Sequence, residues 1–488
     1  MTLDQMLEGV STSAAVSSIP VAGLQYDSRK LRAGEVFFAF PGEHVDGHRF
    51  IPQALENGAA AIVSERAPQG SVVWVQVPHG REALALAALN FYRHPDCRLS
   101  LTGVTGTNGK TTTVYLIDSI LRAAGFVTAR LGTIEQTVAG ERRRTLNTTP
   151  ESLDLVRIFA ELIEKGGSHV AFEVSSHALE LRRVHGFQFH TVVFTNLTRD
   201  HLDFHGTMES YAAAKRRLFE GAGGPVPKFA VIHHGDPWGR QWEKLGGFEL
   251  LTYGVNDEAA ITPSRLVSDF DGLRFTANTP AGRIPIHSPL LGQFNVLNIL
   301  AAIGVGLSYR LSPEIIAQGV AACRAVPGRF ERVDEGQPFV VVVDYAHTDD
   351  ALRNVIRAAR ELVAGRNPTG RVITLFGCGG ARDRTKRPLM GEAAGELSDL
   401  VVLTSDNPRS EDPLNIMNDA LVGLQRATDR YRLEADRALA IRKAISEARA
   451  GDIVILAGKG HETCQIIGSQ TIPFDDREVA RHVLREMI

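Results

Sequence analysis

The chain has 488 residues, of which 44% are hydrophobic and 22% are charged. This length predicts about three domains, and the composition is typical of a folded globular protein rather than a disordered one. The 53 basic and 56 acidic residues nearly cancel, so no global positive field would attract nucleic acid or an anionic membrane. We expect neither as a partner.

Cysteines and apolar runs indicate the compartment. The four cysteines, Cys97, Cys323, Cys378 and Cys464, form no CxxC pair, which argues against a zinc ribbon and against a disulfide framework. The first residues lack a basic stretch followed by an apolar run, and no apolar run approaches the roughly 18 residues of a membrane span. We therefore expect a cytoplasmic protein without membrane insertion.

In chain order, the expected elements fall into three blocks. Residues 1–97 contain a short apolar run, a turn-rich stretch, a helix-like segment and a strand-like segment, which predict a small α/β unit. The second block, residues 98–326, opens with a strand, a glycine turn and a helix. Further buried-type strands follow at 169–175, 191–197 and 228–234. These strands favour a mostly parallel sheet with helices on both faces.

The third block, residues 327–488, alternates apolar strands with amphipathic helices. Apolar residues line one side of the helix expected over 350–363. Buried-type strands are expected at 339–346, 371–377, 399–405 and 452–458. This block predicts a Rossmann-like, doubly wound α/β domain.

The strongest local signal is the glycine loop TGTNGKTTT at residues 105–113, between the strand and the helix that open the second block. Glycines let backbone N–H groups converge on phosphate oxygens, Lys110 adds a cation, and the Thr111 hydroxyl can hold Mg²⁺. The general P-loop pattern would place glycine at Val104, so this loop departs from it. The loop predicts nucleotide binding, but a switch, a transporter subunit or a kinase would fit it equally.

The spelling of this loop resembles the superfamily of Mur ligases and folylpolyglutamate synthetases. For Mur ligases that add the third residue of the muramoyl peptide, the resemblance covers nearly the whole chain through an ordered series of motifs: DSR (27–29), PGEHVDGHRF (41–50), NTTPES (147–152), EVSSHAL (173–179), FTNLTRDHLDFHG (194–206), AAAKRRLF (212–219), GQFNVLNILAA (292–302), PGRFE (327–331), VDYAH (343–347), GCGGARDRTKRPLM (377–390), SDNPRSEDP (405–413) and GKGHE (458–462). It implies an N-terminal UDP-substrate-binding domain, a central ATP-binding domain of the P-loop ATPase type and a C-terminal amino-acid-binding domain. The implied activity is ATP-dependent ligation of a carboxylate to an amine through an acyl phosphate, in peptidoglycan precursor synthesis.

The resemblance implies catalytic roles for Lys110, Glu173, His201 and Lys215. Thr111, Glu173, His201 and Lys215 match ligands of two Mg²⁺ ions, which suit a reaction that brings anions together. A free lysine ammonium cannot ligate Mg²⁺. In the family the matching lysine carries a carbamate formed from CO₂, so we expect Lys215 to be N6-carboxylysine. Viewed alone, Glu173 would be an ordinary strand-end acid and His201 a structural histidine.

Further positions match the family's ligand contacts. Those for ATP are Gly106, Thr107, Asn108, Gly109, Lys110, Thr111, Thr112, Asn295, Arg329 and His347. Those for the UDP-muramoyl peptide are Tyr26, Ser28, Glu43, His44, Val45, Asn147, Thr148, Thr149, Ser175 and Arg183. The chain departs from the family at Asp349, where proline is usual, and at Leu181, where glutamine is common, so one polar contact to the peptide substrate is expected to be absent.

The third block carries the residues that match the amino-acid site: Arg382, Asp406, Asn407, Pro408, Arg409, Gly458 and Glu462. The DNPR sequence at 406–409 resembles the diaminopimelate-adding members, because lysine-adding members usually lack this arginine. A guanidinium can hold the distal carboxylate of diaminopimelate with two hydrogen bonds, whereas lysine would leave it unpaired. We therefore expect a monomer acting on meso-diaminopimelate and UDP-N-acetylmuramoyl-L-alanyl-D-glutamate.

Three alternatives stay open on the sequence. The first is the lysine-adding form of the same ligase. The second, folylpolyglutamate synthetase, shares the loop and the acyl-phosphate chemistry but lacks a uridine-binding first domain of this kind. The third is a nucleotide-binding regulator without catalysis, against which the intact Glu173, His201 and Lys215 count.

Overall fold

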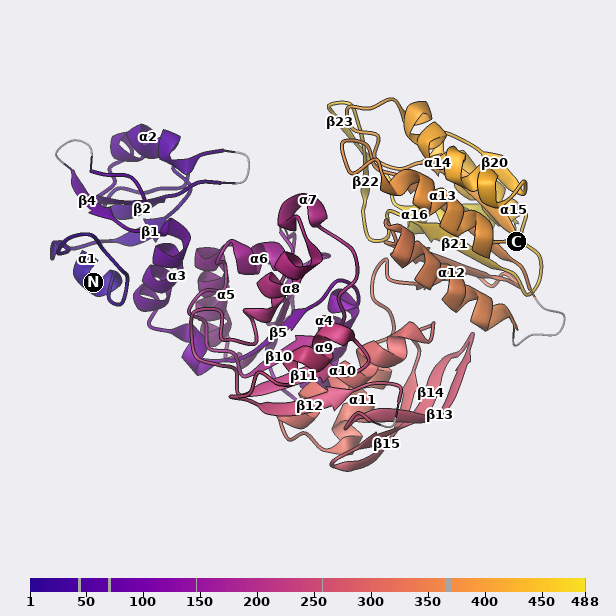
Figure 1. Ribbon diagram of the computed structural model, residues 1–488, viewed down its shortest axis with the longest axis horizontal. Coiled ribbons are helices and arrows are strands. Elements are labelled where there is room, and N and C mark those ends of the chain that lie inside the picture. Colours follow the sequence, from indigo (N-terminus) through magenta and orange to yellow (C-terminus); the bar gives the residue numbers. More distant parts are fainter. Residues whose placement is uncertain (43–44, 69–71, 146, 257, 365–369, 488) are drawn as a thin grey trace.

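The computed structural model describes residues 1–42, 45–68, 72–145, 147–256, 258–364 and 370–487. Three α/β units form an arc, with the central unit at its base and the first and third units above it (Figure 1). The amino terminus lies in the first unit and the carboxyl end in the third. None of the helices in the described ranges is long and apolar enough to cross a membrane.

The first unit is built on a parallel four-stranded sheet in the order β1-β2-β3-β4. Phe37 and Phe38 are adjacent in β2 and pack into different apolar clusters, because side chains alternate between the two faces of a strand. The strands are β1 (Gly23–Gln25), β2 (Glu35–Ala39), β3 (Ala61–Ser64) and β4 (Val73–Gln76), and the helices are α1 (Leu3–Met6), η1 (Gly47–Phe50), α2 (Ile51–Glu56), α3 (Gly80–Phe91) and η2 (Pro95–Arg98), the last leading into the second unit.

The central unit carries an eight-stranded sheet in the order β12-β11-β10-β5-β9-β6-β7-β8, which is parallel except that β7 pairs antiparallel with both β6 and β8. Val114 and Ile117 of α4 pack on one face and Leu155 and Phe159 of α5 on the other. The strands are β5 (Ser100–Thr105), β6 (Thr128–Leu131), β7 (Gln136–Val138), β8 (Glu141–Arg143), β9 (His169–Glu173), β10 (Thr191–Phe194), β11 (Phe229–His233) and β12 (Glu249–Tyr253). The helices are α4 (Lys110–Ala123), α5 (Ser152–Glu164), α6 (Ser176–Glu180), α7 (Leu202–His205), α8 (Met208–Arg216), α9 (Pro237–Trp242), α10 (Phe294–Ser308) and α11 (Pro313–Ala322).

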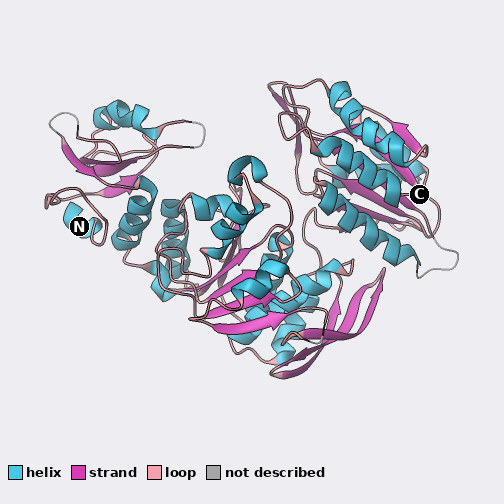
Figure 2. Cartoon of the chain, in the orientation of Figure 1, coloured by secondary structure: helices cyan, strands magenta, loops and turns pink. Residues whose placement is uncertain are grey.

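A separate antiparallel sheet of β13 (Thr262–Asp269), β14 (Gly272–Thr279) and β15 (Gly282–Ser288) packs beside α11 at the base of the arc (Figures 1 and 2). This sheet was not expected from the sequence. Its buried residues Phe275, Ile284 and Ile286 share one apolar cluster with α4 and α10, so the sheet extends the core of the central unit.

The third unit is a six-stranded sheet in the order β16-β17-β21-β18-β19-β20, parallel apart from β16. Its strands are β16 (Glu331–Val333), β17 (Val340–Asp344), β18 (Val372–Cys378), β19 (Leu400–Ser405), β20 (Tyr431–Leu433) and β21 (Ile453–Ala457), followed by the hairpin of β22 (Cys464–Ile467) and β23 (Gln470–Pro473). The helices are α12 (Asp349–Ala364), α13 (Lys386–Leu397), α14 (Pro413–Ala427), α15 (Arg437–Ser446) and α16 (Asp476–Met487). The predicted α/β fold with three domains is confirmed, while the boundaries after residues 97 and 326 stay predictions.

Candidate active site

The glycine loop joins the carboxyl end of β5 to the first turn of α4. Gly106 and Gly109 have φ angles of +150° and +86°, which side chains rarely adopt, and a Cβ on Gly109 would lie 2.4 Å from Asn298 Oδ1. Lys110 Nζ donates to the carbonyl oxygens of Gly106 at 2.9 Å and Thr107 at 2.7 Å. The loop therefore presents a lysine and the N–H groups of a helix start in one place, which suits an anion.

Glu173 ends β9 beside this loop and is 1% exposed. Its Oε1 accepts from Thr111 Oγ1 at 3.0 Å and from Thr133 N at 2.9 Å, and its Oε2 accepts from Thr133 Oγ1 at 3.2 Å. A Cβ on Gly132 would lie 2.4 Å from Glu173 Oε1, so only glycine permits this approach. Thr133 was not predicted from the sequence, although it lies two residues past the end of the buried strand β6, where ligand-binding residues are common.

Lys215 lies on α8 and is 1% exposed. Its Nζ donates to Gly106 O at 2.8 Å and stands 4.5 Å from the centre of the Tyr211 ring. Burial lowers the pKa of Lys215 well below its usual value, and the nearby Lys110 lowers it further. A larger share of the side chain is therefore neutral amine than for an exposed lysine, and a neutral amine is nucleophilic.

His201 stands at the start of α7 with a φ angle of +52°. Its imidazole faces His177 edge to face, with ring centres 4.8 Å apart, and its Nε2 lies 3.4 Å from Asp200 Oδ2. Burial by itself would raise the pKa of Asp200. The net pKa is nevertheless lowered, because the electrostatic interaction with three neighbours, His201, His347 and Lys110, outweighs burial. Asp200 is a second acidic group of the site that the sequence reasoning did not single out.

A cavity of about 580 Å³ opens between the central and third units. It gathers many of the predicted positions: Thr107, Asn108, Gly109, Lys110, Thr111, Thr112, Thr148, Glu173, Ser175, His201, Arg329 and His347. Asn295 does not line it. Asn295 Oδ1 instead accepts at 2.8 Å from Nδ2 of Asn298, which does face the cavity.

Arg329 reaches into this cavity from the third unit. Its Nη2 lies 3.4 Å from Thr111 Oγ1, and its guanidinium carbon stands 4.6 Å from the centre of the Tyr345 ring. Its Nη1 is buried without a hydrogen bond among the described residues. A cation with an unpaired donor beside the phosphate loop is suited to an anionic ligand.

The two units also meet through the first turn of α12. Asp350 Oδ2 accepts from Thr198 Oγ1 at 3.2 Å and from Asn108 Nδ2 at 3.4 Å. Asp349, which stands where the family usually has proline, pairs with Arg199 Nη2 at 3.0 Å. The departure at position 349 therefore coincides with an ion pair between the units.

Predicted positions for the UDP-muramoyl peptide extend from the cavity towards the first unit. The Thr149 hydroxyl donates to Glu173 O at 2.8 Å and accepts from Ser175 N at 3.1 Å, while Arg183 Nη1 donates to Thr149 O at 3.1 Å. Asn147 is exposed at the edge of this group, and Leu181 follows the last residue of α6.

In the first unit, the Tyr26 hydroxyl donates to Asp154 Oδ2 of α5 at 2.6 Å, and burial together with Asp154 raises the pKa of Tyr26. The buried Ser28 hydroxyl donates to Gln53 Oε1 at 2.7 Å, and Val45 is exposed. The predicted contacts Glu43 and His44 lie outside the described residues.

The positions predicted for the amino acid gather beyond the carboxyl ends of β18, β19 and β21. Asn407 Nδ2 and the fully buried Lys459 Nζ both donate to Glu462 Oε2, at 2.8 and 2.9 Å. Arg409 has a φ angle of +53°, and its Nη1 donates to Gly380 O at 2.8 Å.

Glycines bring the rest of this group together. A Cβ on Gly379 would lie 3.0 Å from Arg409 Nη1 and 3.8 Å from Arg382 Cγ, so both arginines flank this glycine. A Cβ on Gly458 would lie 2.7 Å from Asp406 Oδ2. Pro408 is buried next to Arg409.

Comparison with known proteins connects these features. The chain matches family models described as Mur ligase family, catalytic domain (residues 20–92), Mur ligase middle domain (104–306) and Mur ligase, glutamate ligase domain (328–460). It is 60% identical to the UDP-N-acetylmuramoyl-L-alanyl-D-glutamate–2,6-diaminopimelate ligase of Solibacter usitatus, over 99% of this chain and 98% of the relative. This chain belongs to the Mur ligase family.

Two further relatives agree with that assignment. The Mur ligase is 46% identical to the Geobacillus thermodenitrificans protein of the same name, over 96% of this chain and 95% of the relative. A solved structure of a UDP-N-acetylmuramoyl-L-alanyl-D-glutamate–2,6-diaminopimelate ligase matches the Mur ligase with a TM-score of 0.72 and 33% identity, over 100% of this chain and 99% of the other. The Mur ligase is thus an ATP-dependent enzyme that forms a C–N bond.

Proposed function

We propose that this Mur ligase adds meso-2,6-diaminopimelate to UDP-N-acetylmuramoyl-L-alanyl-D-glutamate. The position of Arg409 carries the proposal. It projects from the loop after β19, beside Arg382, and Glu462 is held nearby by Asn407 and Lys459. Two guanidinium groups and one carboxylate suit an amino acid that has a carboxylate and an ammonium at its far end.

In this proposal, Arg409 binds the distal carboxylate of diaminopimelate and Glu462 binds the distal ammonium, with Arg382, Asp406, Pro408 and Gly458 completing the site. Glu462 keeps a fixed orientation because both its hydrogen bonds from Asn407 and Lys459 go to Oε2, and its side chain is 27% exposed. Lysine has no distal carboxylate, so its binding would leave Arg409 without a charged partner, which disfavours it.

The phosphoryl-transfer part of the proposal rests on the cations around the loop. ATP phosphates would lie against the N–H groups of residues 106–112, with Lys110 and Arg329 neutralising charge as the γ-phosphoryl group moves to the glutamate carboxylate. Asn295 would act by orienting Asn298, and His347 would line the ATP side of the cavity. The acyl phosphate then reacts with the diaminopimelate amine, which forms the C–N bond and expels phosphate.

The donor set fits Mg²⁺. A buried carboxylate, a threonine hydroxyl and an imidazole line the cavity, in Glu173, Thr111 and His201, and oxygen-rich sets suit this ion. Bound there, two Mg²⁺ ions would screen the phosphates and the attacking carboxylate from one another.

Lys215 would join this set as a carbamate. Because its lowered pKa favours the neutral amine, Nζ can attack the carbon of CO₂ and release a proton to water, which yields N6-carboxylysine. The product places carboxylate oxygens where the ammonium stood, next to the loop.

The nucleotide-linked substrate would run from the cavity to the first unit. Thr148, Thr149, Ser175, Asn147 and Arg183 would hold the muramoyl-dipeptide portion. Tyr26, Ser28, Glu43, His44 and Val45 would hold the uridine end. We place a monomeric enzyme in the cytoplasm, where ATP and UDP-linked precursors are made.

The test is phosphate release by the full chain with ATP, Mg²⁺ and UDP-N-acetylmuramoyl-L-alanyl-D-glutamate, with meso-diaminopimelate and L-lysine in separate reactions. We expect turnover with diaminopimelate and little with lysine. Arg409→Ala should lower kcat/KM for diaminopimelate by at least about 100-fold, since two hydrogen bonds to a charged group are worth roughly 3 kcal/mol.

Arg432→Ala is the matched control, because Arg432 is an exposed arginine of the same unit that pairs only loosely with Glu447. It should leave both reactions unchanged. Preference of the wild-type chain for lysine would overturn the specificity argument, and absence of turnover with both amino acids would overturn the assignment of the reaction.

A further inference from the structure

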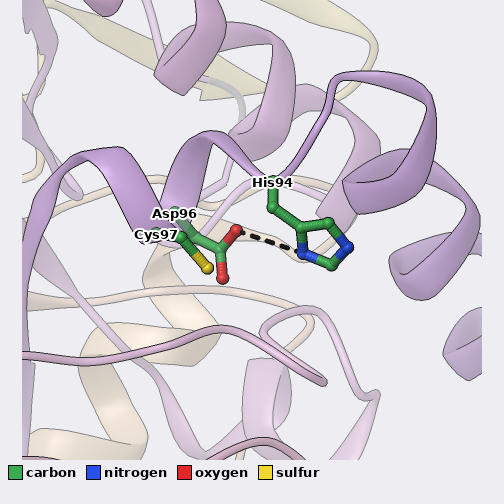
Figure 3. A group of neighbouring side chains, drawn as sticks. All are labelled: His94, Asp96 and Cys97. Atoms are coloured by element: carbon green, nitrogen blue, oxygen red, sulfur yellow. Dashed lines mark ion pairs between the residues drawn. The ribbon is translucent and has the colours of Figure 1, made fainter.

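A group of three potential metal ligands lies outside the lining of the cavity, where α3 of the first unit leads through η2 into the central sheet. His94, Asp96 and Cys97 each offer one ligand atom, and these atoms all lie within 4.8 Å of one another. Figure 3 shows the Asp96 carboxylate between the imidazole and the thiol. His94 and Cys97 are exposed, whereas Asp96 is 2% exposed, so solvent reaches the group from one side.

The hydrogen bonds of Asn90 determine which nitrogen of His94 is free. Asn90 Nδ2 donates to Met6 O at 3.0 Å and to Glu8 O at 2.8 Å, so Asn90 Oδ1 is the acceptor on the other side of the amide. His94 Nε2 lies 3.0 Å from that oxygen and therefore carries the proton. In the neutral ring, Nδ1 then has a lone pair, and it faces Asp96. A metal-binding histidine is usually held in this way through its second nitrogen.

Asp96 has one oxygen without a hydrogen-bond donor. Its Oδ2 accepts from Gln188 N at 3.1 Å, but its Oδ1 is buried and has no hydrogen bond among the described residues. Oδ1 lies 3.7 Å from His94 Nδ1, which is too long for a hydrogen bond. A lone pair and a carboxylate oxygen thus face each other across a gap that a cation would fill.

The spacing and the donor types indicate which cation. Metal–ligand distances of about 2.0–2.3 Å in a tetrahedral zinc site place the ligand atoms about 3.3–3.8 Å apart. The 3.7 Å between His94 Nδ1 and Asp96 Oδ1 lies near the upper end of this range. The Cys97 thiol donates to Gln188 Oε1 at 3.3 Å, and metal binding would replace that bond as the exposed side chain turns towards the ion. A nitrogen, oxygen and sulfur set favours Zn²⁺ over Mg²⁺, which prefers oxygen alone.

We propose that His94, Asp96 and Cys97 form a Zn²⁺ site at the joint between the first and central units. Binding replaces the Cys97 thiol proton, which passes to water, with a metal–sulfur bond. Through Asp96 and its bond from Gln188 N, the ion ties the end of α3 to the segment before β10. Its effect is to restrain the joint between the unit proposed to hold uridine and the unit that carries the phosphate loop.

The test uses the full chain titrated with Co²⁺, which replaces Zn²⁺ and gives an intense ultraviolet absorption only when a thiolate binds it. We expect this absorption to saturate at one Co²⁺ per chain and to disappear on addition of Zn²⁺. The predicted catalytic metal ligands contain no sulfur, so Co²⁺ in the cavity does not produce it.

Cys97→Ser should abolish the absorption, and His94→Ala should weaken Co²⁺ binding at least tenfold, as expected for loss of one ligand. Both side chains are exposed, so these variants should fold, which circular dichroism checks. Cys464→Ser is the matched control, because Cys464 lies in the third unit and is only partly buried; it should retain the signal. Absence of the absorption in the wild-type chain, or its survival in Cys97→Ser, overturns the proposal.

Discussion

Replacing Thr133 by valine removes one donor from Glu173 while the shape of the side chain is kept. The Thr133 hydroxyl supplies the bond to Glu173 Oε2 at 3.2 Å, and it also lies 3.0 Å from Thr148 Oγ1. Oε1 keeps its bonds from Thr111 Oγ1 and Thr133 N. A hydrogen bond to a charged group contributes roughly 1.5–3 kcal/mol. If that energy orients the carboxylate for catalysis, kcat should fall about 10- to 150-fold.

The assay is phosphate release at saturating substrates over a range of Mg²⁺ concentrations. Thr133→Val should lower kcat and raise the Mg²⁺ concentration needed for half-maximal rate, because a less restrained Glu173 binds the ion less tightly. Thr133→Ser keeps the hydroxyl and should restore at least half of the wild-type kcat. A kcat for Thr133→Val within twofold of wild type, at unchanged Mg²⁺ dependence, would refute the reasoning.

Three other predictions follow from the contacts above. Lys215→Met removes the amine that would carry the carbamate, so activity should fall about 100-fold or more. The carbamate signal that ¹³C NMR detects for the wild-type chain in ¹³C-bicarbonate should vanish. A fully active variant would contradict the proposed role of Lys215. Burial lowers the pKa of His169 to about 4, below the unfolded value of about 6.5, so the unfolded chain binds the extra proton and stability is lost as pH falls from about 6.5 towards 4. Between pH 7 and pH 5, the free energy of unfolding measured in urea titrations should fall by on the order of 2 kcal/mol less in His169→Gln than in the wild-type chain. An equal fall in both proteins would count against this. Asp349→Pro places the family's usual residue at the first position of α12, where proline is favoured, and loses only the half-exposed pair with Arg199. The free energy of unfolding should therefore change by less than about 1 kcal/mol, and a loss above about 3 kcal/mol would show a larger role for that ion pair.

Much of the fold could be predicted because its signals are local. Each strand expected at 169–175, 191–197 and 228–234 contains a buried strand of the central sheet, and the helix expected over 350–363 is α12. The sheet of β13, β14 and β15 was missed, although Asp271-Gly272 and Ala281-Gly282 are turn pairs between alternating segments. Those two pairs predict its hairpins.

The site was harder to predict in detail than the fold. Asn295 and Asn298 both belong to the GQFNVLN motif and stand three residues apart, so they share one helix face. Only packing decides that Asn298 faces the cavity while Asn295 supports it from behind. Likewise, Arg387 lies inside a recognised motif but is fully buried, where it pairs with Glu411 and Asp419.

The sequence alone determined the local properties of this protein: the phosphate loop between a strand and a helix, the acids at strand ends, the arginine of DNPR and the resemblance to Mur ligases. These depend on residues close together in the chain, where backbone preference and side-chain chemistry act directly. The tertiary structure decided which of them meet. Thr111 and Glu173 are 62 residues apart and Lys215 and Gly106 are 109 apart, and such pairs form only when the strands align in one sheet and the helices α4 and α8 pack against it. Burial then lowers the pKa of Lys215, a property that depends on the surrounding protein and not on the lysine itself.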